Sequence, residues 1–197
     1  MTAPSYEEAR LALEARLGAS ALAHSDAVAR EAASLAVSYG VDPASARMAG
    51  LLHDWCKESD DTGLIAAAER HGIALTEVDR ARPYLLHARV GAAELSAAFP
   101  ELPRDVVRAV GVHTLGDAQM SDLDCVVYIA DMIEPRRAYA GVEELRSAAG
   151  SASLRELMLL ACGRTLVHVI ESRRPVHPDS VATWNALLAK NTAGGRP

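Results

Sequence analysis

We single out six side chains within the first 131 residues as candidate metal ligands. The densest group is His53-Asp54, where an imidazole stands beside a carboxylate at the end of the apolar run Met48–Leu52, and Lys57 follows three residues later. A polar group in a buried segment needs a partner, and a buried carboxylate needs a countercharge. A divalent metal meets both needs, because imidazole and carboxylate are ligands for zinc, iron and manganese.

The remaining candidates lie at or near the ends of predicted helices, and they are His24, His87, His113 and Asp131. A helical bundle builds a metal site by directing ligands from separate helices to one point. Each residue also has an ordinary explanation, since a helix dipole stabilises a histidine near a C-terminus and Asp131 could pair with Arg136. We assign ordinary roles to the histidines that lack such neighbours, which are His71, His168 and His177. The joint occurrence of the six candidates is what indicates a metal site.

The composition favours helices and argues against several functions. Apolar residues make up 50% of the chain and aromatic residues only 4%, so Ala, Leu and Val must build the core, and alanine is the strongest helix former. A net charge of −6 argues against sequence-independent binding of nucleic acid. Residues 1–16 lack the basic-then-apolar order that is typical of a signal peptide, and we find no apolar run long enough to span a membrane. Three widely spaced cysteines, Cys56, Cys125 and Cys162, imply no disulfide framework. We therefore expect a cytoplasmic protein with no membrane partner and with its cysteines in the core.

Residues typical of helix N-caps and helix ends recur along the whole chain and divide it into predicted helices. Asp42-Pro43 has the N-cap and first-turn residues of the helix that leads into His53, and Ser121 with Asp124 resembles a capping box. We find no convincing β-strand, repeat or linker, and predict a single all-α domain over residues 1–197. The predicted helices cover residues 5–17, 24–39, 43–57, 62–71, 76–82, 90–99, 103–113, 121–133, 142–149, 154–173 and 178–190, and residues 191–197 should fray.

The order His…His-Asp…His…His…Asp resembles the HD-domain superfamily of metal-dependent phosphohydrolases. The closest resemblance is to its YqeK family of bacterial symmetrical dinucleoside tetraphosphatases, and it covers about residues 20–150. Two dipeptides depart from the family pattern: Ala88-Arg89 replaces a usual Gly-Pro pair, and Trp55-Cys56 is bulkier than the usual pair. The matching stretches are residues 24–29, 49–54 with Lys57, 85–87, 90–92, 109–116, 120–121, 128–137 and 141–142.

The resemblance implies a helical HD-domain bundle that contains a two-metal centre. His24, His53, Asp54 and Asp131 would hold the first metal, and His87 and His113 the second, with Asp54 bridging the two. The expected metal is iron, with manganese as the alternative, because the ligands are imidazole and carboxylate without thiolate. Two such metals can clamp a phosphoryl group and activate the attacking water.

The implied reaction is the hydrolysis of diadenosine tetraphosphate to two ADP by a hydroxide that bridges the metals. His53, Asp54 and Asp131 are its implied catalytic residues. The expected substrate-binding residues are Lys57, Arg89, Thr114 and Arg137, of which the basic ones could equally be ordinary surface charge.

Other functions stay open at this stage. A phosphohydrolase of the same superfamily could act on another nucleotide, and a nucleotide-sensing module could keep the fold without catalysis. A purely structural helical scaffold would carry no stoichiometric metal. The helices over residues 151–190 could cover the site or form the face of a homodimer.

Overall fold

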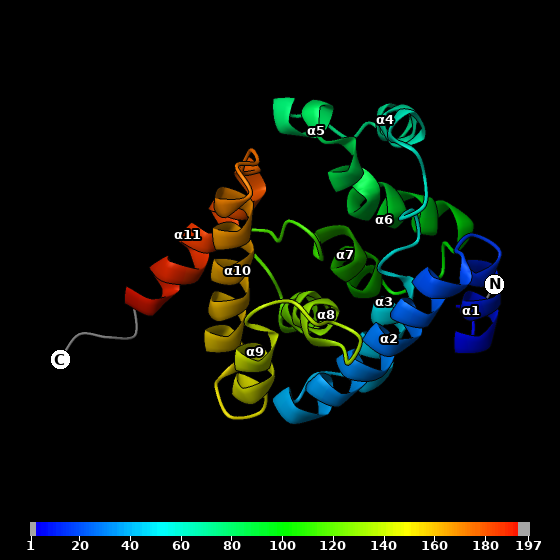
Figure 1. The fold of residues 1–197 in the computed structure, drawn as a ribbon. Coiled ribbons are helices and arrows are strands. Elements are labelled where there is room, and N and C mark those ends of the chain that lie inside the picture. The colour runs from blue at the N-terminus through cyan, green and yellow to red at the C-terminus, as the bar shows by residue number, and fades with distance from the viewer. Residues whose placement is uncertain (1–2, 193–197) are drawn as a thin grey trace.

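The computed structural model describes residues 3–192, in which helices form all of the regular secondary structure (Figure 1). The predicted all-α fold class is therefore confirmed, with no β-strand among the described residues. No helix in this range is both long and apolar enough to cross a membrane. The helices are α1 (Tyr6–Glu14), α2 (Ala19–Tyr39), α3 (Pro43–Leu52), α4 (Asp61–Arg70), α5 (Glu77–Ala81), α6 (His87–Ala98), α7 (Arg104–Val112), α8 (Asp122–Ile133), α9 (Val142–Ala148), α10 (Leu154–Glu171) and α11 (Pro178–Thr192), with the short 3-10 helix η1 (Pro83–Leu86) before α6.

Local capping residues begin the helices that carry the candidate ligands. The Asp42 side chain accepts a hydrogen bond from the Ser45 amide and starts α3, with Pro43 in its first turn. Ser121 and Asp124 form the predicted capping box at the start of α8. Gly40, with a left-handed φ of 71°, ends α2. The sequence therefore sets the register of each of these helices locally.

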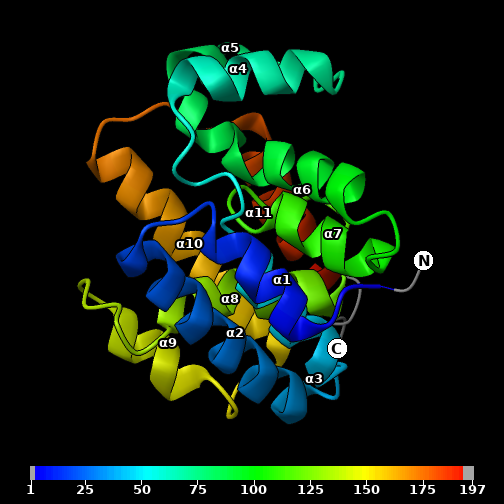
Figure 2. The ribbon, with the colours of Figure 1, turned by 90° about the vertical axis from the view of Figure 1, so that its right-hand side faces the viewer.

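Helix α8 lies at the centre of the molecule, between α2 and α3 on one side and α10 on the other (Figure 1). Most of its residues are buried, and they belong to a single hydrophobic core that extends from α1 to α10. Helices α6 and α7 pack against each other, and α7 also contacts α3 and α8. Helices α4 and α5 lie at one end of the molecule, at the top of both ribbon views (Figure 2).

A glycine allows α3 to lie unusually close to α2. A Cβ at Gly50 would be only 3.0 Å from the Ala29 Cα and 3.0 Å from the Val28 carbonyl oxygen. Contacts this short involve backbone atoms that cannot move aside, so a larger residue would push the helices apart. The close approach brings His24, on α2, next to His53, which directly follows α3.

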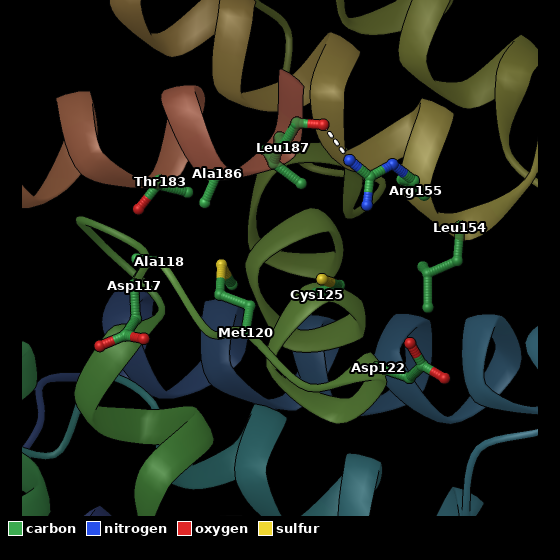
Figure 3. Close-up of a pocket in the computed structure, with 10 residues that line it drawn as sticks. All are labelled: Asp117, Ala118, Met120, Asp122, Cys125, Leu154, Arg155, Thr183, Ala186 and Leu187. Atoms are coloured by element: carbon green, nitrogen blue, oxygen red, sulfur yellow. Dashed lines mark hydrogen bonds between the residues drawn. The ribbon is translucent and has the colours of Figure 1, made fainter. Parts of the chain in front are cut away.

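Helix α11 covers the start of α8 and the loop after α7. Thr183 and Leu187 face Met120 and Cys125 across a cavity of about 110 Å³ (Figure 3). The Thr183 hydroxyl lies 3.3 Å from the Leu115 carbonyl oxygen, in the loop that follows His113. Helix α11 therefore supports the loop that carries Thr114, a predicted substrate-binding residue.

Several predicted helix boundaries were wrong. Helix α3 ends at Leu52, and residues 53–58 form turns. Helix α6 begins at His87 rather than at residue 90, and α2 begins at Ala19, so His24 lies inside α2 instead of opening it. The three cysteines are buried and unbridged, as expected. Residues 191 and 192 belong to α11, and the rest of the tail predicted to fray lies outside the described residues.

Candidate metal centre

The six candidate ligands come together from five parts of the fold. His24 comes from α2, His53 and Asp54 follow α3, and His87 begins α6. His113 follows α7, and Asp131 lies in the last turn of α8. All except His53, which is fully buried behind them, line a cavity of about 290 Å³ that we call the metal cavity.

The two carboxylate oxygens of Asp54 face different histidines. Its Oδ2 lies 3.2 Å from His53 Nε2 and 3.8 Å from His24 Nε2. Its Oδ1 lies 3.3 Å from His87 Nε2 and 3.7 Å from His113 Nε2. The carboxylate therefore stands between two pairs of imidazoles and offers one oxygen to each pair.

Asp131 belongs to the half of the centre that contains His24 and His53. Its Oδ1 lies 3.0 Å from His24 Nε2 and 3.8 Å from His53 Nε2. That half therefore holds two imidazoles and oxygens from two carboxylates, whereas the half around His87 and His113 holds two imidazoles and one oxygen of Asp54. The grouping fits two cations that share the Asp54 carboxylate.

Backbone carbonyls fix the protons of three of the histidines. The Nδ1 atoms of His53, His87 and His113 lie 2.8, 2.7 and 2.7 Å from carbonyl oxygens, in each case three residues earlier in the chain. A carbonyl only accepts hydrogen bonds, so Nδ1 must carry the proton. The neutral imidazole then has an unprotonated Nε2, which is the form that binds a metal.

These Nε2 atoms need a positive partner. His87 Nε2 and His113 Nε2 are 3.2 Å apart, and two unprotonated nitrogens cannot hydrogen-bond to each other. His53 Nε2 is completely buried and has no hydrogen-bond partner among the described residues. The Thr114 hydroxyl lies 3.0 Å from His113 Nε2 and 3.3 Å from His87 Nε2, but its single proton can serve only one of them. The donor set therefore fits metal ions.

The electrostatics of the centre favour the neutral ligand form at His113 and a positive charge at His53. Burial lowers the pKa of His113 to about 4, so this imidazole is neutral at neutral pH. Burial also opposes the ionisation of Asp54, but the neighbouring histidines, His53 foremost, hold the pKa of Asp54 well below its usual range. For His53 burial favours the neutral form, yet the Asp54 charge outweighs it and raises the pKa. The field that favours a proton at His53 would also favour a metal cation there.

Glu134, which we did not predict as a site residue, holds His24. Its Oε1 lies 3.1 Å from His24 Nδ1, so Glu134 does for His24 what the carbonyls do for the other histidines. Its side chain is buried, and its Oε2 accepts a hydrogen bond of 2.7 Å from the Arg136 amide. A carboxylate behind a metal-binding histidine orients the ring and raises its basicity.

We expect Glu134→Ala to weaken metal binding by about 10- to 100-fold, the usual cost of losing a partner that orients a ligand. Glu134→Gln should lose less affinity, because its amide oxygen can still accept the Nδ1 proton. Competition with a metal chelator, monitored for each variant, measures the affinity. If Glu134→Ala binds metal as tightly as the unchanged protein, Glu134 only supports the backbone near Arg136.

Three of the four predicted substrate-binding residues line the metal cavity, namely Lys57, Thr114 and Arg137. Lys57 Nζ lies 3.2 Å from Asp54 Oδ1. The Arg137 guanidinium pairs with the Asp131 carboxylate, and its Nε donates a 2.8 Å hydrogen bond to the Asp131 carbonyl. Arg136, which we had considered as the partner of Asp131, instead donates to the Ser20 carbonyl at 3.0 Å.

Arg89, the fourth of these residues, is not among those that line the metal cavity. Its guanidinium pairs with the buried carboxylate of Asp79, near the start of α11. Arg89 follows His87 by two positions on α6, and residues two apart do not share a helix face. The same carboxylate lies 3.3 Å from Nε2 of His177. This histidine, for which the sequence predicts only an ordinary role, is buried.

Comparison of the sequence with known proteins identifies a family match and several relatives. The model of the HD domain matches residues 21–136. A Bacillus subtilis protein named "Bis(5'-nucleosyl)-tetraphosphatase, symmetrical" is 31% identical over 93% of this chain and 97% of its own length. A Staphylococcus aureus protein of the same name is 29% identical, with 92% of this chain and 93% of that protein covered.

A solved structure extends the likeness to the whole fold. A predicted HD superfamily hydrolase from Clostridium acetobutylicum superposes with a TM-score of 0.90 at 33% identity, covering 95% of this chain and 99% of that one. The resemblance inferred from the sequence is thereby confirmed. Because the matched segment contains all six converging side chains, the chain belongs to the HD-domain family.

Proposed function

We propose that this protein is a metal-dependent hydrolase that cuts diadenosine tetraphosphate symmetrically into two ADP. Relatives named symmetrical bis(5'-nucleosyl)-tetraphosphatases along nearly the whole chain support the substrate and the reaction. The observation in this chain that carries the proposal is the position of Asp54, whose two oxygens face separate pairs of imidazoles.

The proposed ligands form two sets. His24, His53, Asp54 and Asp131 would hold one metal, and His87, His113 and Asp54 the other. When bound, the two ions would stabilise charge on phosphoryl oxygens and make water a better nucleophile at neutral pH. Imidazole and carboxylate ligands without thiolate favour iron, with manganese as the alternative.

The basic side chains would bind and orient the phosphate chain. Burial disfavours the charged form of Lys57, but the Asp54 carboxylate outweighs this and raises the Lys57 pKa, so the ammonium stays protonated. Arg137 adds a planar fork of donors that matches phosphate oxygens. Both groups line the cavity and would balance charge on the phosphate chain and on the ADP that leaves.

The bond that breaks joins the bridging oxygen to one of the two central phosphorus atoms. The oxygen of one water molecule is added to that phosphorus and completes the first ADP. The bridging oxygen leaves with the second ADP. We propose that the side chains around the metal cavity hold the middle of the chain, rather than its ends, at the reacting position.

We expect ADP to be the only nucleotide product of diadenosine tetraphosphate. In water enriched in heavy oxygen, one atom of label should appear per pair of ADP molecules, because one water is consumed per bond cut. Chromatography with mass spectrometry measures both the product and the label. Formation of ATP and AMP would contradict the symmetrical cut, since it would place attack near one end of the chain.

A further inference from the structure

An apolar cavity of about 160 Å³ adjoins the metal cavity. It lies between η1, the second half of α10 and the segment that leads into α11. Tyr84, Thr114 and Thr165 line both cavities, so a ligand that passes these three side chains would reach from one into the other. Leu85, Leu166, Val169, Pro175 and Val176 form most of the apolar wall.

Two arginines are among the residues that line this cavity. Arg82 and Arg174 both line it and are exposed, and neither forms an ion pair with another described residue. Two unpaired guanidinium groups beside an apolar wall suit a ligand that is flat and apolar at one end and anionic next to it.

Tyr84 lies between the two cavities and leaves part of its ring free. The residue is 43% exposed, its ring centroid is 4.9 Å from that of His87, and Lys57 Nζ lies 4.9 Å above the ring. An exposed aromatic face at this position can pack against a ribose or a base. The adjoining lysine would meet the phosphates that follow.

We propose that this cavity, which we call the nucleoside pocket, holds the base of one nucleoside while the attached phosphate chain runs past Tyr84 and Thr114 into the metal cavity. The inference rests on the proposed function, because it assigns a place to one end of that substrate. At about 160 Å³ the pocket is smaller than the roughly 300–1,000 Å³ of sites that enclose a whole drug-sized ligand, so it suits one ring system. Arg82 and Arg174 would bind the phosphate nearest the nucleoside.

Two substitutions on one helix test the pocket. Val169 is half-buried and lines the nucleoside pocket, whereas Val167, on the same helix, is 52% exposed and lines a separate groove. Val169→Trp should weaken ADP binding and raise the KM for diadenosine tetraphosphate by about 10- to 100-fold, the range over which fit in an apolar pocket discriminates ligands. Val167→Trp should change neither. Inhibition by inorganic tripolyphosphate, which has no nucleoside, should be the same in both variants.

A second pair avoids the risk that a new tryptophan disturbs folding. Arg174→Ala should weaken ADP binding by about tenfold, as expected for the loss of one charge-assisted hydrogen bond. Its neighbour Arg173, which is exposed but does not line the pocket, provides the control Arg173→Ala. Titration calorimetry with ADP measures all four variants, and their melting temperatures report folding.

The outcomes separate this inference from the proposed function. Equal ADP affinity in Val169→Trp and Val167→Trp, or in Arg174→Ala and Arg173→Ala, would overturn the nucleoside pocket even if the unchanged protein forms ADP symmetrically. Failure of the unchanged protein to cleave diadenosine tetraphosphate would overturn the proposed function. ADP affinity that depends on Val169 and Arg174 would support the pocket in either case.

Discussion

Replacing Asp54 with alanine will empty the metal centre and abolish hydrolysis. The Asp54 carboxylate offers Oδ2 to His24 and His53 and Oδ1 to His87 and His113, so its removal takes one ligand from each half. Even a partner that only orients a ligand contributes about 10–100-fold to metal affinity, and the loss of a shared ligand should exceed this. We expect a metal-to-protein ratio near zero, against about two for the unchanged protein.

His87→Ala and His113→Ala are the matched controls for this experiment. Both remove ligands from the same half of the centre, so they should leave about one metal per chain, bound by the other half. Plasma mass spectrometry after anaerobic, iron-replete purification measures the ratios. If the unchanged protein carries only one metal under these conditions, His87 and His113 do not form a second site.

Replacing Arg137 with alanine will lower kcat/KM for diadenosine tetraphosphate by about 10- to 1,000-fold, the scale of one or two charge-assisted contacts to phosphate. Arg137 lines the metal cavity, and its guanidinium can reach ligands there. Lys57→Ala should have an effect of the same size, because Lys57 lines the same cavity. Both variants should keep their metals, since neither side chain is a proposed ligand.

The neighbouring residue gives a control for Arg137. Arg136 carries the same charge, but it donates to the Ser20 carbonyl and is not among the residues that line the metal cavity. Arg136→Ala should therefore keep kcat/KM within a few-fold of the unchanged protein, as expected for a surface contact. Steady-state kinetics on the pair compares them directly, and equal losses would mean that Arg137 acts through general surface charge.

Features that depend on neighbours in sequence were predictable. Capping residues such as Asp42 and Ser121 set the helices locally, and the structure has the caps where the sequence indicates them. The candidate ligands at His53, Asp54, His87 and His113 could be selected because each stands next to an apolar run at a helix end. The family resemblance then supplied the grouping that the residues alone left open.

Features that depend on contacts distant in sequence were not predictable in this way. Glu134 and His24 are 110 residues apart, and His177 and Asp79 are 98 apart, so no local pattern joins them. Arg89 illustrates the opposite problem. It lies close to His87 in sequence, but its position on α6 directs it to Asp79 instead of the metal cavity. Nearness in sequence is a poor guide to position on a helix unless the period of the helix is applied.

The carbonyl partners of His53, His87 and His113 bear on the order in which the protein folds and takes up metal. Each ring is held by an oxygen three residues earlier, so its orientation is set as soon as that turn forms. Small zinc domains, by contrast, draw their folding free energy from the ion and unfold without it. A chain whose ligands are oriented in advance can fold first and load later. The identity of the ion then depends on cellular supply and on the relative affinities of the available divalent metals, and one ion can replace another without refolding.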